Sequence, residues 1–114
     1  MGYSAKQGDI VRISFDPQAG HEQAGRRPAV VVSNDTFNRF AKTAAMVCPI
    51  TNTDRDVPLH VKLDSRTSTT GVIMCDQAKI LDLQKRGAEW IERAPDDIVF
   101  EVVDIIAGFI EIGG

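Results

Sequence analysis

The segment 20–28 concentrates side chains that can act on a phosphate. It reads GHEQAGRRP, so one histidine, one glutamate and two arginines fall within nine residues. A guanidinium carries a fork of N–H donors that matches phosphate geometry. Arg27 stands one residue before a β-branched run, so we expect a well-anchored backbone there, and Gly20 and Gly25 permit a tight loop. On composition alone, the alternative is a surface hairpin with a salt-bridged arginine.

Further motifs follow in order along nearly the whole chain. They are GDIV at 8–11, FDP at 15–17, GHEQAGRRPAVVVS at 20–33, FNR at 37–39, CPIT at 48–51, TTGVIMCDQAKILD at 69–82 and RGAEWIERAP at 86–95. This ordered set resembles the MazF/PemK (Kid) toxin family. The pieces GHEQ, TTGV and CDQ place the resemblance closest to the PemK branch.

The resemblance implies a toxin that is a metal-independent endoribonuclease for single-stranded RNA. It implies attack by the 2′-OH on the adjacent phosphate, which leaves a 2′,3′-cyclic phosphate and a 5′-OH. No cofactor is expected. The implied partners are single-stranded RNA, a second copy of the chain in a homodimer, and a cognate antitoxin whose C-terminal tail covers the active surface.

The resemblance also assigns roles to individual residues. Arg27 matches the active-site arginine that stabilises the phosphorane, and Thr51 matches a catalytic Thr/Ser that bonds a nonbridging oxygen. Glu22 and Asp76 match carboxylates proposed as general base in the MazF and PemK branches, respectively. The expected substrate-binding residues are His21, Gln23, Arg26, Thr70 and Gln77.

One position departs from the PemK pattern. That branch has an arginine, proposed as general acid, two residues before the aspartate, and here the position is Met74. The paired Asp–Arg mechanism therefore cannot operate intact, and the emphasis moves to Arg27 and Thr51. Asp76 and Gln77 have a structural alternative, in which they tie a strand to the 21–27 loop.

Two alternatives to the nuclease belong to other classes. A nonenzymatic gyrase poison of the CcdB kind shares the fold but relies on a Trp-Gly-Ile near its C-terminus, and this chain has no tryptophan there. A catalytically silent homologue that only binds the antitoxin is the other alternative, and Met74 keeps it open. RNA sequence preference is expected to depend on loops 52–58 and 64–70.

The elements that must position these residues follow from hydrophobic patterning. Strands are predicted over 10–15, 28–33, 43–51, 58–63, within 71–80 and over 87–93, with a short helix at 35–40 and a helical turn at 82–86. Pro28 is expected only at the start of its strand. His60 is expected to be exposed on its strand, and Trp90 to be core or dimer surface.

The clearest helix is predicted at the C-terminal end. Pro95 suits its first position, Asp96 and Asp97 suit its positive end, and Gly113-Gly114 end it. We therefore predict one mainly β (α+β) domain over 1–114, a small SH3-like or CcdB-like β-barrel with a C-terminal helix and one or two short helices. Its helix has more apolar residues than one barrel covers, and Cys48–Ile50 and Trp90-Ile91 add apolar surface, which favours a homodimer.

Composition bounds the remaining possibilities. The 114 residues are 43% hydrophobic and 25% charged, as in an ordinary globular protein. The net charge of −3 argues against nonspecific coating of nucleic acid, although residues 95–114 alone carry five acids and no base. Cys48 and Cys75 are expected to be reduced and buried, with no zinc-ligand spacing. Residues 1–7 lack a signal-peptide core and no apolar run fits a membrane span, so the cytoplasm is expected.

Overall fold

The computed structural model describes residues 3–16, 25–53 and 56–114, which form seven strands and two α-helices. In chain order these are β1 (Asp9–Ser14), β2 (Arg26–Val31), α1 (Asp35–Ala41), β3 (Ala44–Thr51), β4 (His60–Lys62), β5 (Val72–Met74), the short 3-10 helix η1 (Cys75–Gln77), β6 (Lys79–Asp82), β7 (Glu89–Arg93) and α2 (Asp96–Phe109).

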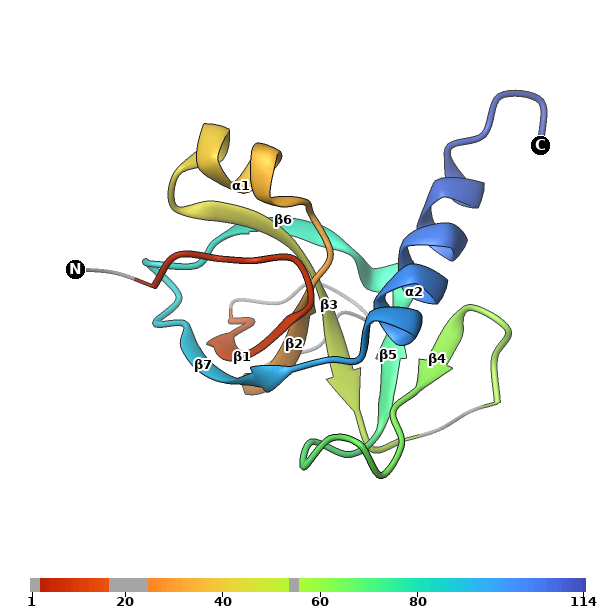
Figure 1. The fold of residues 1–114 in the computed structure, drawn as a ribbon, viewed down its shortest axis with the longest axis horizontal. Helices are drawn as coiled ribbons and strands as arrows, with labels where there is room; N and C mark the ends of the chain where they lie inside the picture. Colours follow the sequence, from red (N-terminus) through yellow and green to blue (C-terminus); the bar gives the residue numbers. More distant parts are fainter. Residues whose placement is uncertain (1–2, 17–24, 54–55) are drawn as a thin grey trace.

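One curved antiparallel sheet links all seven strands, as Figure 1 shows. Its order is β4-β5-β3-β2-β1-β7, and β6 pairs with β3 beyond the end of β5. Within the described residues β4 and β7 do not pair, so the barrel is not closed. The predicted mainly β fold with a C-terminal helix is therefore confirmed, in an open form.

Side-chain alternation on these strands builds two hydrophobic clusters, one on each face of the sheet. The first contains Ile10, Val30, Cys48, Ile50, Ile73 and Cys75 and is covered by Ile98, Val99 and Val102 of α2. The second contains Val11, Ile13, Phe15, Ala29, Val31, Val47 and Leu83. Cys48–Ile50 is buried, so the prediction that it adds exposed apolar surface is wrong.

Proline and glycine positions differ slightly from the sequence prediction. Pro28 is the third residue of β2, not the first; it faces Arg12 on β1, and the pairing of β2 with β3 begins only at Ala29. Pro95 is the N-cap of α2, and its carbonyl accepts from the N–H groups of Ile98 and Val99. The helix ends at Phe109, before Gly113-Gly114. The Arg86 N–H donates to the Asp82 carbonyl at 3.2 Å, four residues back, so the predicted helical turn at 82–86 is present.

Helix α1 begins where the sequence predicted. The Asn34 side chain accepts a hydrogen bond from the Phe37 N–H at 2.8 Å, which satisfies one of the donors left open at a helix start. Helix α1 packs on β3, whereas α2 packs on β4 and η1 across the other part of the sheet (Figure 1). The end of β3 that carries Thr51 therefore remains clear of α1.

Candidate active site

Strand register brings Arg27 and Thr51 to neighbouring strands at one end of the sheet. Strands β2 and β3 pair through Ala29 with Pro49 and Val31 with Val47. Arg27 and Thr51 lie two residues beyond the last of these pairs, so they stand at the same end of the two strands. Alternation puts both on the face of the second cluster, because Ala29 and Val47 point there. The two residues with proposed catalytic roles are thus placed together by the core that packs beneath them.

Thr51 is more buried than expected for a substrate contact. Its relative exposure is 6%. Its Oγ1 accepts a hydrogen bond from the Thr53 N–H at 3.1 Å. Because a hydroxyl that accepts still has its own proton, this oxygen remains able to donate.

Gly71 allows a second chain segment to approach Thr51 closely. Its φ is +118°, and a Cβ built on it would lie 2.3 Å from the carbonyl oxygen of Thr51. A side chain at position 71 would therefore push the 64–71 loop away from the end of β3. The glycine in the motif TTGV is required by this contact.

Arg26 and Arg27 are adjacent but lie on opposite faces of β2. The Arg26 guanidinium bonds the Glu89 carboxylate at 2.6 Å and the Gly87 carbonyl at 3.1 Å. Arg86 likewise donates to the carbonyls of Ser14 and Asp16, both at 3.1 Å. These interactions tie β7 and the preceding turn to β1 and β2, so the structure places Arg26 in a β2–β7 contact. The predicted His21, Glu22 and Gln23 lie outside the described residues.

A polar groove of about 410 Å³ lies at this end of the sheet, on the face opposite to Arg27 and Thr51. Arg12, Pro28 and Ile91 line it from β1, β2 and β7, and Asn52 and the 68–70 segment complete it. The Thr70 hydroxyl bonds the Asn52 amide oxygen at 2.9 Å, so the predicted substrate residue Thr70 is in the groove. Sequence analysis did not single out Arg12 or Asn52, because neither belongs to a recognisable motif.

The loop that forms one wall of this groove is held by charged groups at its base. The Glu92 carboxylate accepts from the N–H groups of Ser68 and Thr69, at 3.1 and 2.7 Å, and from the Thr69 hydroxyl at 2.7 Å. Desolvation alone would raise the pKa of Glu92, but these hydrogen bonds outweigh it and hold the pKa below its usual value. Arg66 joins Asp64 to Asp97 at the start of α2.

Asp76 lies away from the Arg27–Thr51 pair. Ile73 pairs with Ile50 of β3, and Lys79 pairs with Val47. Asp76 lies between these two pairs in the chain and is therefore beside the middle of β3. At the usual rise of a strand this is roughly 10 Å along the sheet from Thr51. Its neighbour Gln77 donates from Nε2 to the Met74 sulfur at 3.7 Å.

His60 contacts Asp76 and is not exposed, so that prediction is wrong. Its side chain is 9% exposed, and Nε2 lies 3.3 Å from the Asp76 carboxylate. Trp90 is not core; it is 57% exposed, with its indole N–H donated to Asp9 at 3.3 Å. The correction to His60 arises because a partner more than ten residues away in the chain decides its burial, whereas the exposed Trp90 keeps dimer surface as its predicted alternative.

The two thiols are free and buried, as predicted. Burial, followed by the nearby Cys75 and Asp76, raises the pKa of Cys48 far above the usual thiol value. Burial also raises the pKa of Cys75 to about 11, with Asp76 as the next contribution. Within the described ranges, no three His, Cys, Asp or Glu side chains gather closely enough to hold a metal ion.

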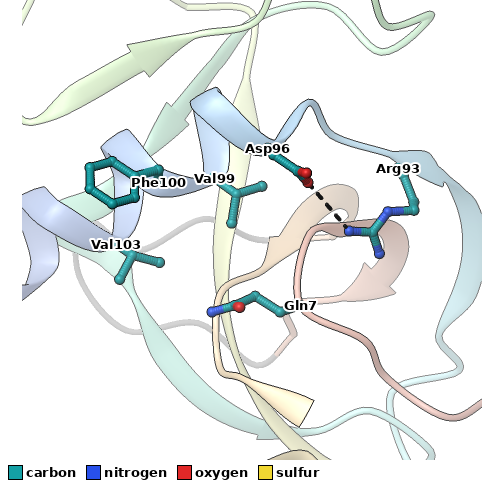
Figure 2. A pocket seen from close by; sticks show the side chains of 6 residues that line it. All are labelled: Gln7, Arg93, Asp96, Val99, Phe100 and Val103. Carbon is teal, nitrogen blue, oxygen red and sulfur yellow. Dashed lines mark ion pairs between the residues drawn. The ribbon is translucent and has the colours of Figure 1, made fainter.

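A second hollow, of about 260 Å³, lies between α2 and the N-terminal segment. Figure 2 shows Val99, Phe100 and Val103 of α2 on one side, with Gln7 below and the Arg93–Asp96 ion pair on the other side. Phe100 is exposed. Helix α2 has 14 residues, and no helix in the described part of the chain has the length and apolar character of a bilayer span.

Comparison with known proteins identifies the family of this chain. Residues 6–110 match the model of the PemK-like, MazF-like toxins of type II toxin–antitoxin systems. Endoribonuclease PemK from Escherichia coli is 40% identical over 102 residues, which is 86% of this chain and 76% of that protein.

Solved structures agree with the sequence match. The crystal structure of MazF from Deinococcus radiodurans superposes with a TM-score of 0.88 at 35% identity, over 96% of this chain and 98% of that one. A MazE–MazF crystal structure from the same organism gives 0.84 at 34% identity, over 98% and 100%. The chain therefore belongs to the PemK-like, MazF-like family of type II toxins.

Proposed function

We propose that this chain is a toxin endoribonuclease that cleaves single-stranded RNA at short sequences and is neutralised by an antitoxin. The observation that carries the chemistry is that Arg27 and Thr51 lie two residues beyond the last paired residues of β2 and β3, at the same end of the sheet. Family membership and similarity to a protein named endoribonuclease PemK support the same activity. The same similarity leaves the gyrase-poison alternative without support.

The proposed reaction is an internal transfer at one phosphate. The 2′-oxygen attacks phosphorus in line, the bond from phosphorus to the 5′-oxygen breaks, and the products are a 2′,3′-cyclic phosphate and a 5′-OH. The 2′-OH proton leaves to a base, and the 5′-oxygen gains one. Arg27 stabilises the negative charge on the phosphorane, and Thr51 donates its hydroxyl proton to a nonbridging oxygen.

Two carboxylates are candidates for the general base. Glu22, which the family resemblance suggests as base, lies outside the described residues. Asp76 is exposed to solvent at 41% of its side chain and is roughly 10 Å along the sheet from Thr51. Arg27 is also the proposed donor to the leaving oxygen, because Met74 has no proton to give.

The RNA is proposed to run from the Arg27–Thr51 pair around the end of β3 into the polar groove on the other face of the sheet. Arg12, Asn52 and Thr70 supply a cation, an amide and a hydroxyl there. Residues His21, Gln23, Arg26 and Gln77 remain proposed RNA contacts. The 64–70 loop is expected to influence which bases are accepted, because its backbone is held by Glu92 against the groove.

Helix α2 supports the proposed homodimer. Its outer surface and the residues after it expose large apolar side chains, namely Phe100, Val103, Phe109, Ile110 and Ile112. Its acidic residues are exposed as well. Phe100 and Val103 lie together on one side of α2, and an exposed apolar patch marks an interface more often than a free surface. The antitoxin is proposed because a related MazF is crystallised with MazE, and the site of action is proposed to be the cytoplasm.

The activity is tested by incubating purified protein with a long RNA in excess EDTA and mapping both product ends. We expect cleavage to continue, with 5′-OH and 2′,3′-cyclic phosphate ends, and to stop when the attacking residue is 2′-deoxy. Loss of cleavage in EDTA, with recovery on adding a divalent ion, would contradict the mechanism.

The dimer is tested separately by light scattering at micromolar concentration. We expect twice the mass of one chain, and we expect Phe100→Asp to lower that mass while circular dichroism stays unchanged. A monomer with full ribonuclease activity would show that the second copy is unnecessary.

A further inference from the structure

His60 contacts Asp76 beside position 74, where this chain has a methionine and not a charged residue. Residue 74 is a buried methionine, and strand pairing sets His60 directly opposite it on β4. From that position His60 Nε2 reaches the Asp76 carboxylate at 3.3 Å. The strand next to Met74 therefore supplies the N–H that residue 74 cannot supply.

The other ring nitrogen decides where the proton of His60 lies. Nδ1 is buried and has no hydrogen-bond partner among the described residues. A buried N–H without an acceptor is costlier than a buried lone pair without a donor. The geometry therefore favours the tautomer with its proton on Nε2, donated to Asp76.

Burial differs sharply across this pair. The His60 side chain is 9% exposed, whereas that of Asp76 is 41% exposed. The imidazole is thus held by its surroundings and orients one carboxylate oxygen. The rest of the carboxylate remains accessible as an acceptor for a donor outside the protein.

We propose that His60 is a positioning residue that holds Asp76 as a hydrogen-bond acceptor for the RNA. This inference rests on the proposed ribonuclease function. The RNA group that donates to Asp76 is an O–H or N–H, because a carboxylate repels phosphate. One candidate donor is the 2′-OH, whose proton Asp76 then takes. The other is a base N–H, by which Asp76 recognises the base.

The test compares His60→Leu, His60→Gln, Asp76→Asn and the double variant in single-turnover cleavage of a preferred RNA. His60→Leu is expected to lower the cleavage rate about tenfold, the size of one hydrogen bond to a charged group. His60→Gln is expected to stay within about threefold of wild type, because its amide keeps an N–H where Nε2 was. The double variant is expected to be no worse than Asp76→Asn, since the two residues act through one contact.

Two arms distinguish the source of the donor. If Asp76 takes the 2′-OH proton, Asp76→Asn slows cleavage equally at every target sequence. If Asp76 reads a base, Asp76→Asn changes the preference at one position of a randomised RNA library, and His60→Leu changes the same position. Both results support the proposal.

Controls keep the proposal falsifiable. Asp82→Asn removes the same charge at the end of β6 and keeps an oxygen for the Lys85 N–H, so its cleavage should equal wild type. If His60→Leu does not fold, His60→Asn replaces it, because its shorter amide does not reach Asp76. Wild-type rates in His60→Leu, or equal losses in His60→Leu and His60→Gln, would overturn the inference. A wild-type protein that does not cleave RNA would overturn the ribonuclease function instead.

Discussion

Two carboxylates, Asp9 on β1 and Asp76 in η1, occupy opposite kinds of environment. The Asp9 side chain is 5% exposed and accepts from the Tyr3 hydroxyl, the Lys6 N–H at 3.2 Å and the Trp90 indole N–H at 3.3 Å, with Arg93 at 3.5 Å. The Asp76 side chain is 41% exposed and contacts His60.

The difference separates a carboxylate that holds the fold from one that is available to a substrate. Donors from the N-terminal segment and β7 surround Asp9, so it joins the chain's beginning to its last strand. Burial and the contact with Asp9 raise the pKa of Tyr3 far above its usual value, so this phenol stays protonated. Changes near Asp9 should act on stability, and changes near Arg27, Thr51 and Asp76 should act on cleavage.

The largest expected effect is on folding at Asp9. Asp9→Ala leaves the Tyr3, Trp90 and Arg93 donors without their acceptor and should lower the free energy of unfolding by about 3 kcal/mol. Urea denaturation measures this loss. Cleavage per folded molecule should be unchanged, and a loss below about 1 kcal/mol would show that the cluster is not the structural site described.

The second largest expected effect is on RNA cleavage, at Arg27 and Thr51. Arg27→Ala and Thr51→Ala should each lower kcat about 10²-fold, the scale for losing one donor to a transition-state oxygen. Arg27→Ala should keep its melting temperature, whereas Thr51→Ala should lose some stability because Thr51 is buried. Thr51→Ser, which keeps the hydroxyl, is the matched control. Activity within a fewfold of wild type in either alanine variant would remove that residue from the mechanism.

Thiol labelling tests whether the open region around Asp76 is still firmly packed on its inner side. Because the pKa of Cys75 is raised from 9.0 to about 11, its thiolate fraction at pH 8 should be about 100-fold below that of a free thiol. Labelling with a chromogenic disulfide should be slow by at least that factor and should become fast in urea. Rapid labelling of the native protein would mean that η1 opens readily.

The smallest effect concerns the loop beside the groove. Glu92→Ala removes the acceptor for the Ser68 and Thr69 N–H groups, so hydrogen exchange of these two amides should quicken several-fold while β3 is unaffected. Acidification should have the same effect on amide exchange in the wild-type protein, because the pKa of Glu92 is lowered. The stabilisation of the loop by the Glu92 carboxylate is present at neutral pH and is lost as pH falls through that lowered pKa. Unchanged exchange in Glu92→Ala would show that the loop does not depend on this carboxylate.

The spacing of apolar residues alone was sufficient to predict most strands and helices of the fold. Alternating apolar residues predicted the strands, and the i, i+3, i+4 spacing of 98–110 predicted α2, because local backbone geometry sets both periods. The ends of elements were less certain. Pro28 lies inside β2 because its neighbour β3 pairs only from Ala29 onward, and that fact depends on a strand about twenty residues away.

The candidate site divides in the same way. The motifs around Arg27, Thr51 and Asp76 were visible as residue types at given spacings, and the family resemblance gave them proposed roles. That Arg27 and Thr51 lie at the same end of the paired strands β2 and β3, and that Arg26 is bound to Glu89 across 63 residues of sequence, depends on how strands pair.

Residue types alone show which positions are apolar, which turns can form and which side chains are able to act on a phosphate. Folding encloses Asp9, buries His60 against Asp76 and leaves Trp90 exposed, and residue types do not show any of these outcomes. Burial and hydrogen bonding of a polar side chain depend on its neighbours in space. Asp9 and Trp90 are 81 residues apart in the chain and meet only because β1 pairs with β7.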